Sequence, residues 1–245
     1  MNETLDILLN HSSVRKYTNE SVKSEIVDLI IQAGQMAPSS SNFQAYTIIE
    51  VKDQERRNAI YEASGRQEWI LNAPLLLLFC GDLDRGKSYY SGVKDREIFT
   101  NTESFLVATI DTALVAQKVL IAAQSLGLGG VFIGGIRNDM EKISKSFDLP
   151  NFVFPLFAMC IGYPDENNGV KPRLPKEVIH KIDSYISSKE EKLIKEYDEI
   201  NYKYYYERTN GQHPETWTER SGKAITAKPR YGVGVFLREK GLLKK

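Results

Sequence analysis

This 245-residue sequence has no excess of charge of either sign, because 32 Lys and Arg residues balance 32 Asp and Glu residues. Proteins that bind nucleic acid through its phosphates, or an anionic membrane through its surface, carry an excess of cations. The balance argues against both classes of partner, and we expect neither nucleic acid nor membrane as a partner. Any role for cations must therefore be local.

Cysteine is also scarce. Cys80 and Cys160 lie far apart, each in an apolar run, and the sequence contains no CxxC motif and no cluster of Cys and His. A buried thiol behaves as a small hydrophobic side chain, so we expect two core residues and no bound metal. The longest uninterrupted apolar run, residues 73–80, is too short to span a bilayer. The first ten residues lack the features of a signal peptide, and we expect a cytoplasmic soluble protein.

What the sequence does contain is an ordinary globular composition, 42% hydrophobic and 26% charged, which is enough for one sizeable core. Short apolar runs bounded by turn residues predict buried strands at YTIIEV, PLLLLFCG, VFIGG and VFPLFAMCIGYP. Segments with apolar residues at helical spacing lie between them. This mixture of strands and separated helices predicts an α+β core.

Three further segments define the organisation of the chain. Residues 103–127 are apolar nearly all round, which predicts a helix buried against another helix or a partner subunit. Residues 82–101 are polar and predict a mobile loop or surface excursion. From residue 181 onward the chain is charged and rich in tyrosine, without a core-like stripe, which predicts a helical arm packed on something outside its own core. We therefore predict a core, 1–180, and a C-terminal extension, 181–245, within one domain.

Cations gather locally in GVKPRLP, residues 169–175. Pro172 and Pro175 restrict the backbone and favour extended conformation in the residues before them. Residues i and i+2 of an extended segment point the same way. Lys171 and Arg173 are therefore predicted to lie side by side, suited to an anion; a Pro-rich surface linker is the alternative.

Other polar clusters also suit an anion. In HSSVR, the residues His11, Ser13 and Arg15 alternate and would share one face of an extended turn, offering good partners for phosphate. A plain solvated turn is the alternative. The loop PSSSN adds three successive hydroxyl donors, Ser39, Ser40 and Ser41, or is only a loop that begins at a proline.

Neither phosphate-binding fingerprint, GxxxxGK[ST] or a GxGxxG after a strand, is present. The glycine-rich stretch LGLGGVFIGG follows a long helix and brackets a strand, so a helix C-cap and a tight turn explain its glycines. The alternative is that Gly134 and Gly135, which lack side chains, let backbone N–H groups approach a flat ligand closely.

Taken in order, HSSVRKYT, SSSNFQ, SGRQ, GGVFIGGIRN, IGYP, KPRLP and YYYERTNG resemble the motifs of the flavin-dependent nitroreductase family, in its NADPH-linked nitroreductase A and FMN reductase branch. The resemblance extends over essentially the whole chain. It implies a nitroreductase-like fold: a central mixed β-sheet flanked by helices, with a C-terminal helical extension that wraps the partner subunit. It also implies an intertwined homodimer that binds two FMN molecules at the subunit interface.

The resemblance also implies roles for individual residues. The FMN phosphate and nearby ribityl oxygens would be held by His11, Ser13, Arg15, Lys171 and Arg173. The flavin would be contacted from the partner subunit by Ser39, Ser40 and Ser41. Gln67 in SGRQ would hydrogen-bond the pyrimidine end of the ring, and backbone groups near its N5 edge would come from Ile133, Gly134 and Gly135. Arg208 would receive the 2′-phosphate of NADPH.

The implied activity is two-electron transfer from NADPH, or NADH, through bound FMN to nitroaromatics, quinones or free flavin by ping-pong exchange. Flavin carries such chemistry itself, so no side chain is expected to act as a general acid; Arg15 is a candidate for electrostatic support, with backbone N–H groups as rivals. Ser12 replaces the usual Arg of the family's HRS[IV]R motif, and Gln212 and His213 stand where relatives often have basic residues. The alternative function is a non-catalytic dimeric sensor that binds flavin or a nucleotide.

Overall fold

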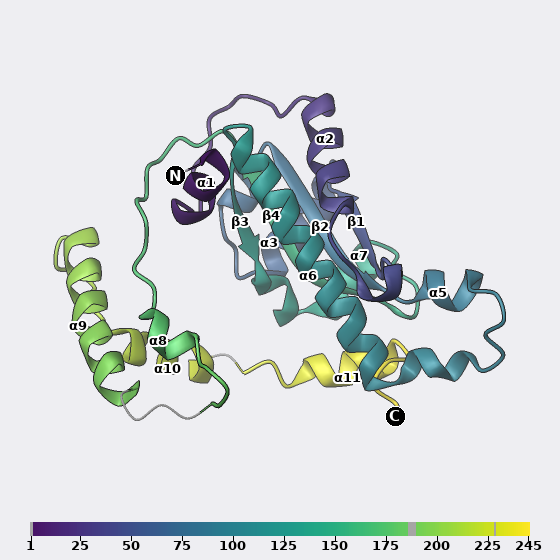
Figure 1. The fold of residues 1–245 in the computed structure, drawn as a ribbon. Helices are drawn as coiled ribbons and strands as arrows, with labels where there is room; N and C mark the ends of the chain where they lie inside the picture. The colour runs from purple at the N-terminus through teal and green to yellow at the C-terminus, as the bar shows by residue number, and fades with distance from the viewer. Residues whose placement is uncertain (1, 186–189, 228) are drawn as a thin grey trace. The chain divides into compact units, whose positions relative to one another are not determined.

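The computed structural model describes residues 2–185, 190–227 and 229–245 (Figure 1). The chain forms two compact units, the first from residues 1–168 with 230–245 and the second from residues 169–229. Each is described by itself. The division predicted at residue 180 stays a prediction, and the predicted helical arm includes residues 186–189, which lie outside the described residues.

The first unit contains a four-stranded sheet in the order β1-β2-β4-β3. Its strands are β1 (Tyr46–Glu50), β2 (Leu75–Asp82), β3 (Gly129–Ile133) and β4 (Val153–Gly162). The four predicted strands are confirmed. All three pairings are antiparallel in the described part of the chain, which corrects the mixed sheet that the resemblance implies.

Helices cover both faces of this sheet (Figure 1). Those of the first unit are α1 (Glu3–Leu9), α2 (Ser24–Gln35), α3 (Gln54–Ala63), α4 (Trp69–Asn72), α5 (Asp84–Tyr89), α6 (Thr102–Ser125), α7 (Met140–Ser146) and α11 (Gly232–Glu239), with 3-10 turns η1 (Ser40–Asn42), η2 (Arg96–Thr100) and η3 (Gly134–Asn138). Asp53 caps α3, because its Oδ1 accepts the Arg56 N–H at 2.8 Å.

Strand β2 is apolar at nearly every position because it is covered on both faces. Leu75, Leu77 and Phe79 pack in one cluster with side chains of α2 and α6. The alternate residues Leu76, Leu78 and Cys80 pack in another with side chains of α3 and α7. Side chains of a strand alternate between faces, so a continuous apolar run is what a sheet between two helical layers requires. The buried position predicted for both cysteines is confirmed.

Helix α6 is the one helix among the described residues that is long and apolar enough to cross a membrane by length and composition. It packs as a core helix, since Val115 and Val119 are fully buried against the sheet. Its other side carries Leu106, Ile110 and Leu114, and Ile110 is 54% exposed in this chain. The predicted helix is confirmed, with one side in the core and the other outside it.

The polar segment 82–101 is more ordered in the structure than the predicted loop. It contains α5 and η2, and Phe99 within it is buried. Arg85 ties the segment to the sheet through an ion pair with Asp82 at 3.0 Å and a bond to the Tyr46 carbonyl at 3.1 Å. Polarity alone was misleading because one of the charged residues, Arg85, is bonded to the edge of the sheet.

The second unit contains α8 (Lys176–Ile179), α9 (Glu190–Arg208) and α10 (Trp217–Ala227). Along α9, Tyr197, Asn201 and Tyr205 are buried at a spacing of four residues, the spacing that places side chains on one helix face. The prediction that this region lacks a core-like stripe is therefore wrong. The stripe consists of tyrosine and asparagine, so a search for aliphatic residues at helical spacing does not detect it.

Candidate functional site

The backbone of HSSVR is fixed on two sides. The Val14 N–H donates to the Gly130 carbonyl next to it on β3 at 3.1 Å, and the side chain of Val14 is buried. The amide of Asn168 donates to the Ser13 carbonyl at 3.2 Å, and the Arg15 N–H donates to a carboxylate oxygen of Glu166. The alternating residues of the motif thus stand on a rigid segment beside the sheet.

Glu166 is the anchor of this segment, and sequence reasoning missed it. Its Oε1 also accepts the Lys16 N–H at 3.2 Å. Burial alone raises the pKa of Glu166, but hydrogen bonds from the Arg15 N–H, Asn168 and the Lys16 N–H together outweigh it and lower the pKa below its ordinary value. The carboxylate is thus ionised while it holds the backbone that carries Arg15.

The side chains of the motif reach different neighbours. The guanidinium carbon of Arg15 lies 5.5 Å from the centroid of the Trp69 ring, within the range of a cation–π contact. His11 Nδ1 lies 3.1 Å from the side-chain nitrogen of Gln124 on α6. Trp69 begins α4 two residues after Gln67, so this contact links HSSVR to SGRQ.

Gln67 and the glycine pair at the end of β3 form one surface. The amide nitrogen of Gln67 donates to the Ser64 carbonyl at 2.7 Å. A Cβ on Gly135 would lie 2.9 Å from Ser64 Cα and 3.1 Å from the Gln67 amide nitrogen, closer than side chains tolerate. Position 135 thus needs glycine because the two segments approach there. Ile133, just before the pair, is buried at 1% exposure.

Two buried polar atoms lie in the segment that carries Gln67. Among the described residues, Ser64 Oγ and Trp69 Nε1 are buried and have no hydrogen-bond partner in the protein. Buried polar groups are normally hydrogen-bonded. This segment therefore retains unused hydrogen-bonding capacity.

The serine loop is held by a single buried carboxylate. Asp111 on α6, 1% exposed, accepts the Ser40 N–H at 3.0 Å and the Ala45 N–H at 3.2 Å. Ser41 adopts the left-handed conformation, with φ of 45° and ψ of 28°, and Ser39 Oγ accepts the Gln44 N–H at 3.3 Å. The loop is a fixed turn; a lone Asp within an apolar helix is the sequence signal that could have identified its anchor.

In the second unit, residues 171–173, called here the KPR segment, are attached to α9. The Tyr197 hydroxyl donates to the Pro172 carbonyl at 3.0 Å. The ammonium of Lys171 lies 5.1 Å from the centroid of the Tyr205 ring, and a guanidinium nitrogen of Arg173 donates to the Lys171 carbonyl at 2.7 Å. Arg173 is exposed and Lys171 half-buried. The tyrosines of α9 support both cations, a role that their sequence spacing did not indicate.

Arg208 lies at the end of α9 and lines a cavity of about 620 Å³ within the second unit. Its guanidinium donates to the Tyr204 hydroxyl at 2.7 Å. Two further cations, Arg220 and Lys223 of α10, line the same cavity together with Gln212 and His213. Sequence reasoning identified Arg208 and missed Arg220 and Lys223.

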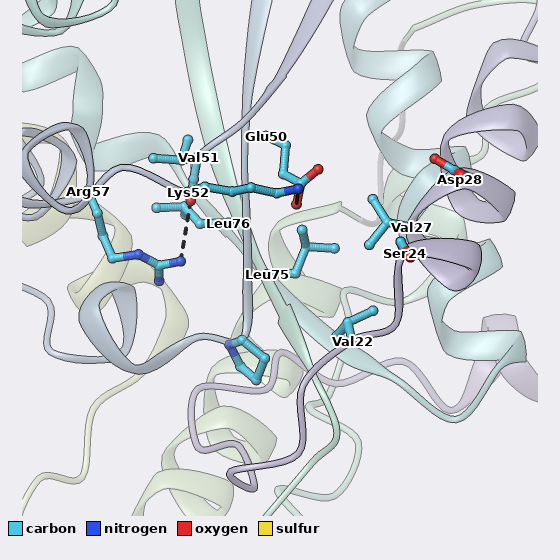
Figure 2. A pocket seen from close by; sticks show the side chains of 11 residues that line it. Val22, Ser24, Val27, Asp28, Glu50, Val51, Lys52, Arg57, Leu75 and Leu76 are labelled. Carbon is cyan, nitrogen blue, oxygen red and sulfur yellow. Dashed lines mark hydrogen bonds and ion pairs between the residues drawn. The ribbon is translucent and has the colours of Figure 1, made fainter.

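A different cavity, of about 420 Å³, lies in the first unit and contains none of the predicted site residues (Figure 2). The guanidinium of Arg57 there donates to the carbonyls of Ile70 and Ala73, both at 2.8 Å, and of Val51. Burial lowers the pKa of Arg57. The residue is fully engaged in joining β1 to the segment before β2, which is a structural role.

The predicted residues thus fall into three groups. Within the first unit, Arg15 of HSSVR contacts Trp69, two residues after Gln67, and Gln67 packs against Gly135; the serine loop is held separately by Asp111. Lys171, Arg173 and Arg208 belong to the second unit. Among the described residues, no group of three or more His, Cys, Asp or Glu side chains could hold a metal ion.

Comparison with known proteins shows which family the chain resembles over its whole length. The model of the nitroreductase family matches residues 8–163, and that of the nitroreductase family C-terminal domain matches residues 171–245. The chain is 37% identical to an FMN reductase (NADPH) of Bacillus subtilis and 36% identical to an NADPH-flavin oxidoreductase of Vibrio harveyi, over 100% of both chains in each case.

Solved structures agree with these matches. The NfrA1 nitroreductase of Bacillus subtilis superposes with a TM-score of 0.95 at 36% identity, over 99% of this chain and 100% of that one. The NADPH:FMN oxidoreductase of Vibrio harveyi, complexed with NAD+, superposes with a TM-score of 0.90 at 35% identity, over 100% of both chains. This protein belongs to the nitroreductase family.

Proposed function

We propose that this protein is an FMN-dependent NAD(P)H oxidoreductase of the nitroreductase and FMN reductase type. Electrons pass from NADPH, or NADH, through bound FMN to nitroaromatics, quinones or free flavin by ping-pong exchange. Relatives that match the whole chain are named as an FMN reductase (NADPH) and an NADPH-flavin oxidoreductase. The structural observation that supports the proposal is the close packing of the glycine turn after β3 against Ser64 and the amide of Gln67, which brings two of the predicted segments together.

The side chains present fit FMN. The close approach at Gly135 brings the backbone of the glycine turn next to the amide side chain of Gln67, and groups of this kind suit the polar edge of a flat ring. Arg15, with its backbone fixed by Glu166, and His11 are suitable donors for a phosphate. The same segment contains the unpartnered buried atoms Ser64 Oγ and Trp69 Nε1.

The roles proposed for individual residues follow the family. The phosphate and ribityl oxygens are bound by His11, Ser13, Arg15, Lys171 and Arg173. The flavin of the partner subunit is contacted by Ser39, Ser40 and Ser41. The pyrimidine end is bound by Gln67, the N5 edge faces the backbone of Ile133, Gly134 and Gly135, and the 2′-phosphate of NADPH is bound by Arg208.

Bound FMN supplies the hydride acceptor and two-electron carrier. The protein binds and orients the reactants, and Arg15 supplies positive charge to the flavin, with backbone N–H groups as rivals for that role. Glu166 and Trp69 hold Arg15 in place and thereby limit the reorganisation needed on binding. No side chain is required to transfer a proton within the site.

We further propose a cytoplasmic homodimer whose C-terminal extension wraps the partner subunit, and which acts on small molecules without nucleic acid or membrane. The outer side of α6 supports the dimer, because Leu106, Ile110 and Leu114 are exposed in the single chain. A row of exposed aliphatic side chains on a long helix is typical of a surface that another chain covers.

The decisive experiment is steady-state kinetics of the FMN-loaded protein. NADPH and NADH oxidation are followed by absorbance with nitrofurazone, a quinone or free FMN as the acceptor. We expect oxidation with parallel double-reciprocal lines, the signature of ping-pong exchange. Stoichiometric flavin without consumption of either nucleotide would favour the sensor, and a protein that cannot be loaded with FMN would contradict both functions.

The cation pair of the KPR segment gives the first prediction. Changing Lys171 and Arg173 together to Ala removes two charge-assisted contacts to phosphate, each worth about 1.5–3 kcal/mol. We expect the purified variant to lose its FMN, measured as the ratio of flavin absorbance to protein. The exposed pair Lys192 and Lys203 of α9, changed together to Ala, controls for lost charge in the same unit. Stoichiometric flavin in the first variant would overturn the assignment.

A further inference from the structure

The cavity that Arg208 lines is shaped by a well-defined helix start. Thr216 Oγ1 accepts the Glu219 N–H at 3.2 Å, and a carboxylate oxygen of Glu219 accepts the Thr216 N–H at 3.1 Å, which is a reciprocal capping box. The Thr218 N–H also donates to Asp198 of α9 at 3.0 Å. The first turn of α10 is thereby fixed against α9, and so are the side chains that it presents to the cavity.

Glu215, just before this turn, engages two of the three Arg and Lys side chains that line the cavity. One carboxylate oxygen lies 2.7 Å from Lys223 Nζ and the other lies 3.3 Å from a guanidinium nitrogen of Arg220. The side chain of Glu215 is 25% exposed, less than either of its partners. Arg220 is also held over the Tyr205 ring, 4.5 Å from its centroid.

The carboxylate is ionised at neutral pH. The hydrogen bond from Lys223 is the main cause that lowers the pKa of Glu215, and the charges of Lys223 and Arg220 add to it. The cavity therefore presents a negative charge between two cations, beside Arg208. A dianionic phosphate that enters must displace Glu215 from these cations or bind against its charge. A ribose without a 2′-phosphate meets no such repulsion, and its 2′-hydroxyl can donate to a carboxylate.

We propose that Glu215 sets the preference of this protein between NADPH and NADH, by competing with the 2′-phosphate for Arg220 and Lys223. This inference rests on the proposed function, because it takes the cavity as the site of the nucleotide's adenosine end. Arg208 attracts the phosphate, and Glu215 reduces that attraction. NADH then remains a competent donor although the cavity contains three cations.

The test is Glu215→Gln, which removes the charge and keeps the size of the side chain. We expect the ratio of kcat/KM for NADPH to that for NADH to rise about fivefold to tenfold, the effect of one repulsive charge at a partly exposed site. The change should lie mainly in KM for NADPH. Glu199→Gln, an exposed carboxylate of α9 outside the cavity lining, should leave the ratio unchanged.

A binding measurement separates this inference from the proposed function. By calorimetry, Glu215→Gln should bind adenosine 2′,5′-bisphosphate about fivefold to tenfold more tightly, with the affinity for AMP unchanged. If the wild-type protein oxidises neither nucleotide, the proposed function fails and this binding result still decides the role of Glu215. An unchanged or lower preference for the bisphosphate would overturn it, because Glu215 would then serve only to position Arg220 and Lys223.

Discussion

The two compact units are stabilised by different kinds of interaction. The first buries large aliphatic and aromatic side chains on both faces of its sheet, with Leu76, Leu78 and Phe79 fully buried. The second buries Tyr197 and Asn201 along α9 and adds ion pairs at its surface. The unit that carries the glycine pair and Gln67 is thus stabilised mainly by apolar burial, whereas the unit that carries Arg208 and the KPR segment has a core built from polar side chains.

This contrast indicates that the two units have different roles in binding. Hydrophobic burial does not depend on charge and so is not weakened by electrostatic screening, and close packing fixes positions, as a site for a flat cofactor requires. Exposed ion pairs contribute little to stability and are screened by salt, so their arrangement adjusts readily when a charged ligand arrives. The second unit therefore suits the reversible binding of anions more than it suits the permanent holding of a ring.

Removing a core side chain from β2 should produce the largest effect. Phe79→Ala leaves a cavity in a layer packed between the sheet and two helices, and we expect it to lower the free energy of unfolding by about 3–5 kcal/mol. Urea unfolding followed by circular dichroism measures this loss. The matched control is Phe132→Ala on β3, where the ring is 37% exposed and less burial is lost. An equal loss in both variants would contradict the view that β2 is the centre of the core.

The same contrast explains how much of the fold could be predicted. The strands were predictable because burial on both faces demands continuous apolar runs, and α6 because its composition is apolar nearly all round. The order of the segment 82–101 was not, since it depends on Arg85 meeting carbonyls of the sheet edge far away in the sequence. The stripe on α9 was not, because it consists of tyrosine and asparagine, and the burial of Tyr197 and Asn201 comes with hydrogen bonds that the sequence does not show.

A pair of glycine substitutions, one in each unit, tests the contrast between the units with an effect of intermediate size on the free energy of unfolding. At Gly135 an added Cβ would meet the backbone of Ser64 at 2.9 Å, whereas at Gly222 in α10 it would meet nothing within 4 Å. We expect Gly135→Ala to lower the free energy of unfolding by about 1–3 kcal/mol because of overpacking, and to weaken FMN binding. Gly222→Ala should raise it by about 0.5–1 kcal/mol, because alanine is the better helix former.

Both variants are measured by urea unfolding and by titration of the apoprotein with FMN. Gly222→Ala serves as the control for flavin affinity, which should not change. If Gly135→Ala retained full stability and flavin affinity, the close approach between the glycine pair and SGRQ would have no role in the site.

The candidate site shows the same limit of prediction. Motif order identified HSSVR, SGRQ, the glycine pair and KPRLP, because each contains its own functional groups. The anchors Asp111, Glu166 and Trp69 were not identified, since each acts on a segment distant in the sequence. A side chain whose only role is to hold another segment leaves no local pattern, except where, as with Asp111, it is a carboxylate in the middle of an otherwise apolar stretch of helix.

The smallest expected effect compares two carboxylates, one in each unit. The pKa of Glu166 and of Glu215 are both lowered. Each carboxylate therefore stabilises the folded protein above the ordinary glutamate pKa, about 4.3, and this contribution is lost as the pH falls through the lowered value. Glu166 gains its stabilisation mainly from fixed N–H groups, and Glu215 gains it from the cations Lys223 and Arg220.

Salt should therefore separate the two carboxylates. Raising NaCl from about 0.05 to 1 M shortens the screening length to about 3 Å, so we expect the pKa of Glu215 to move up toward its ordinary value. The pKa of Glu166 should move less, because hydrogen bonds from the backbone of Arg15 and Lys16 are not displaced by ions. Carboxyl-carbon NMR titrations of the wild type and of Glu166→Gln and Glu215→Gln assign and measure both groups. Equal pKa shifts would mean that Glu166, the anchor of HSSVR, is as open to solvent ions as Glu215 in the cavity of the second unit. The two units would then not differ in the way that their buried residues indicate.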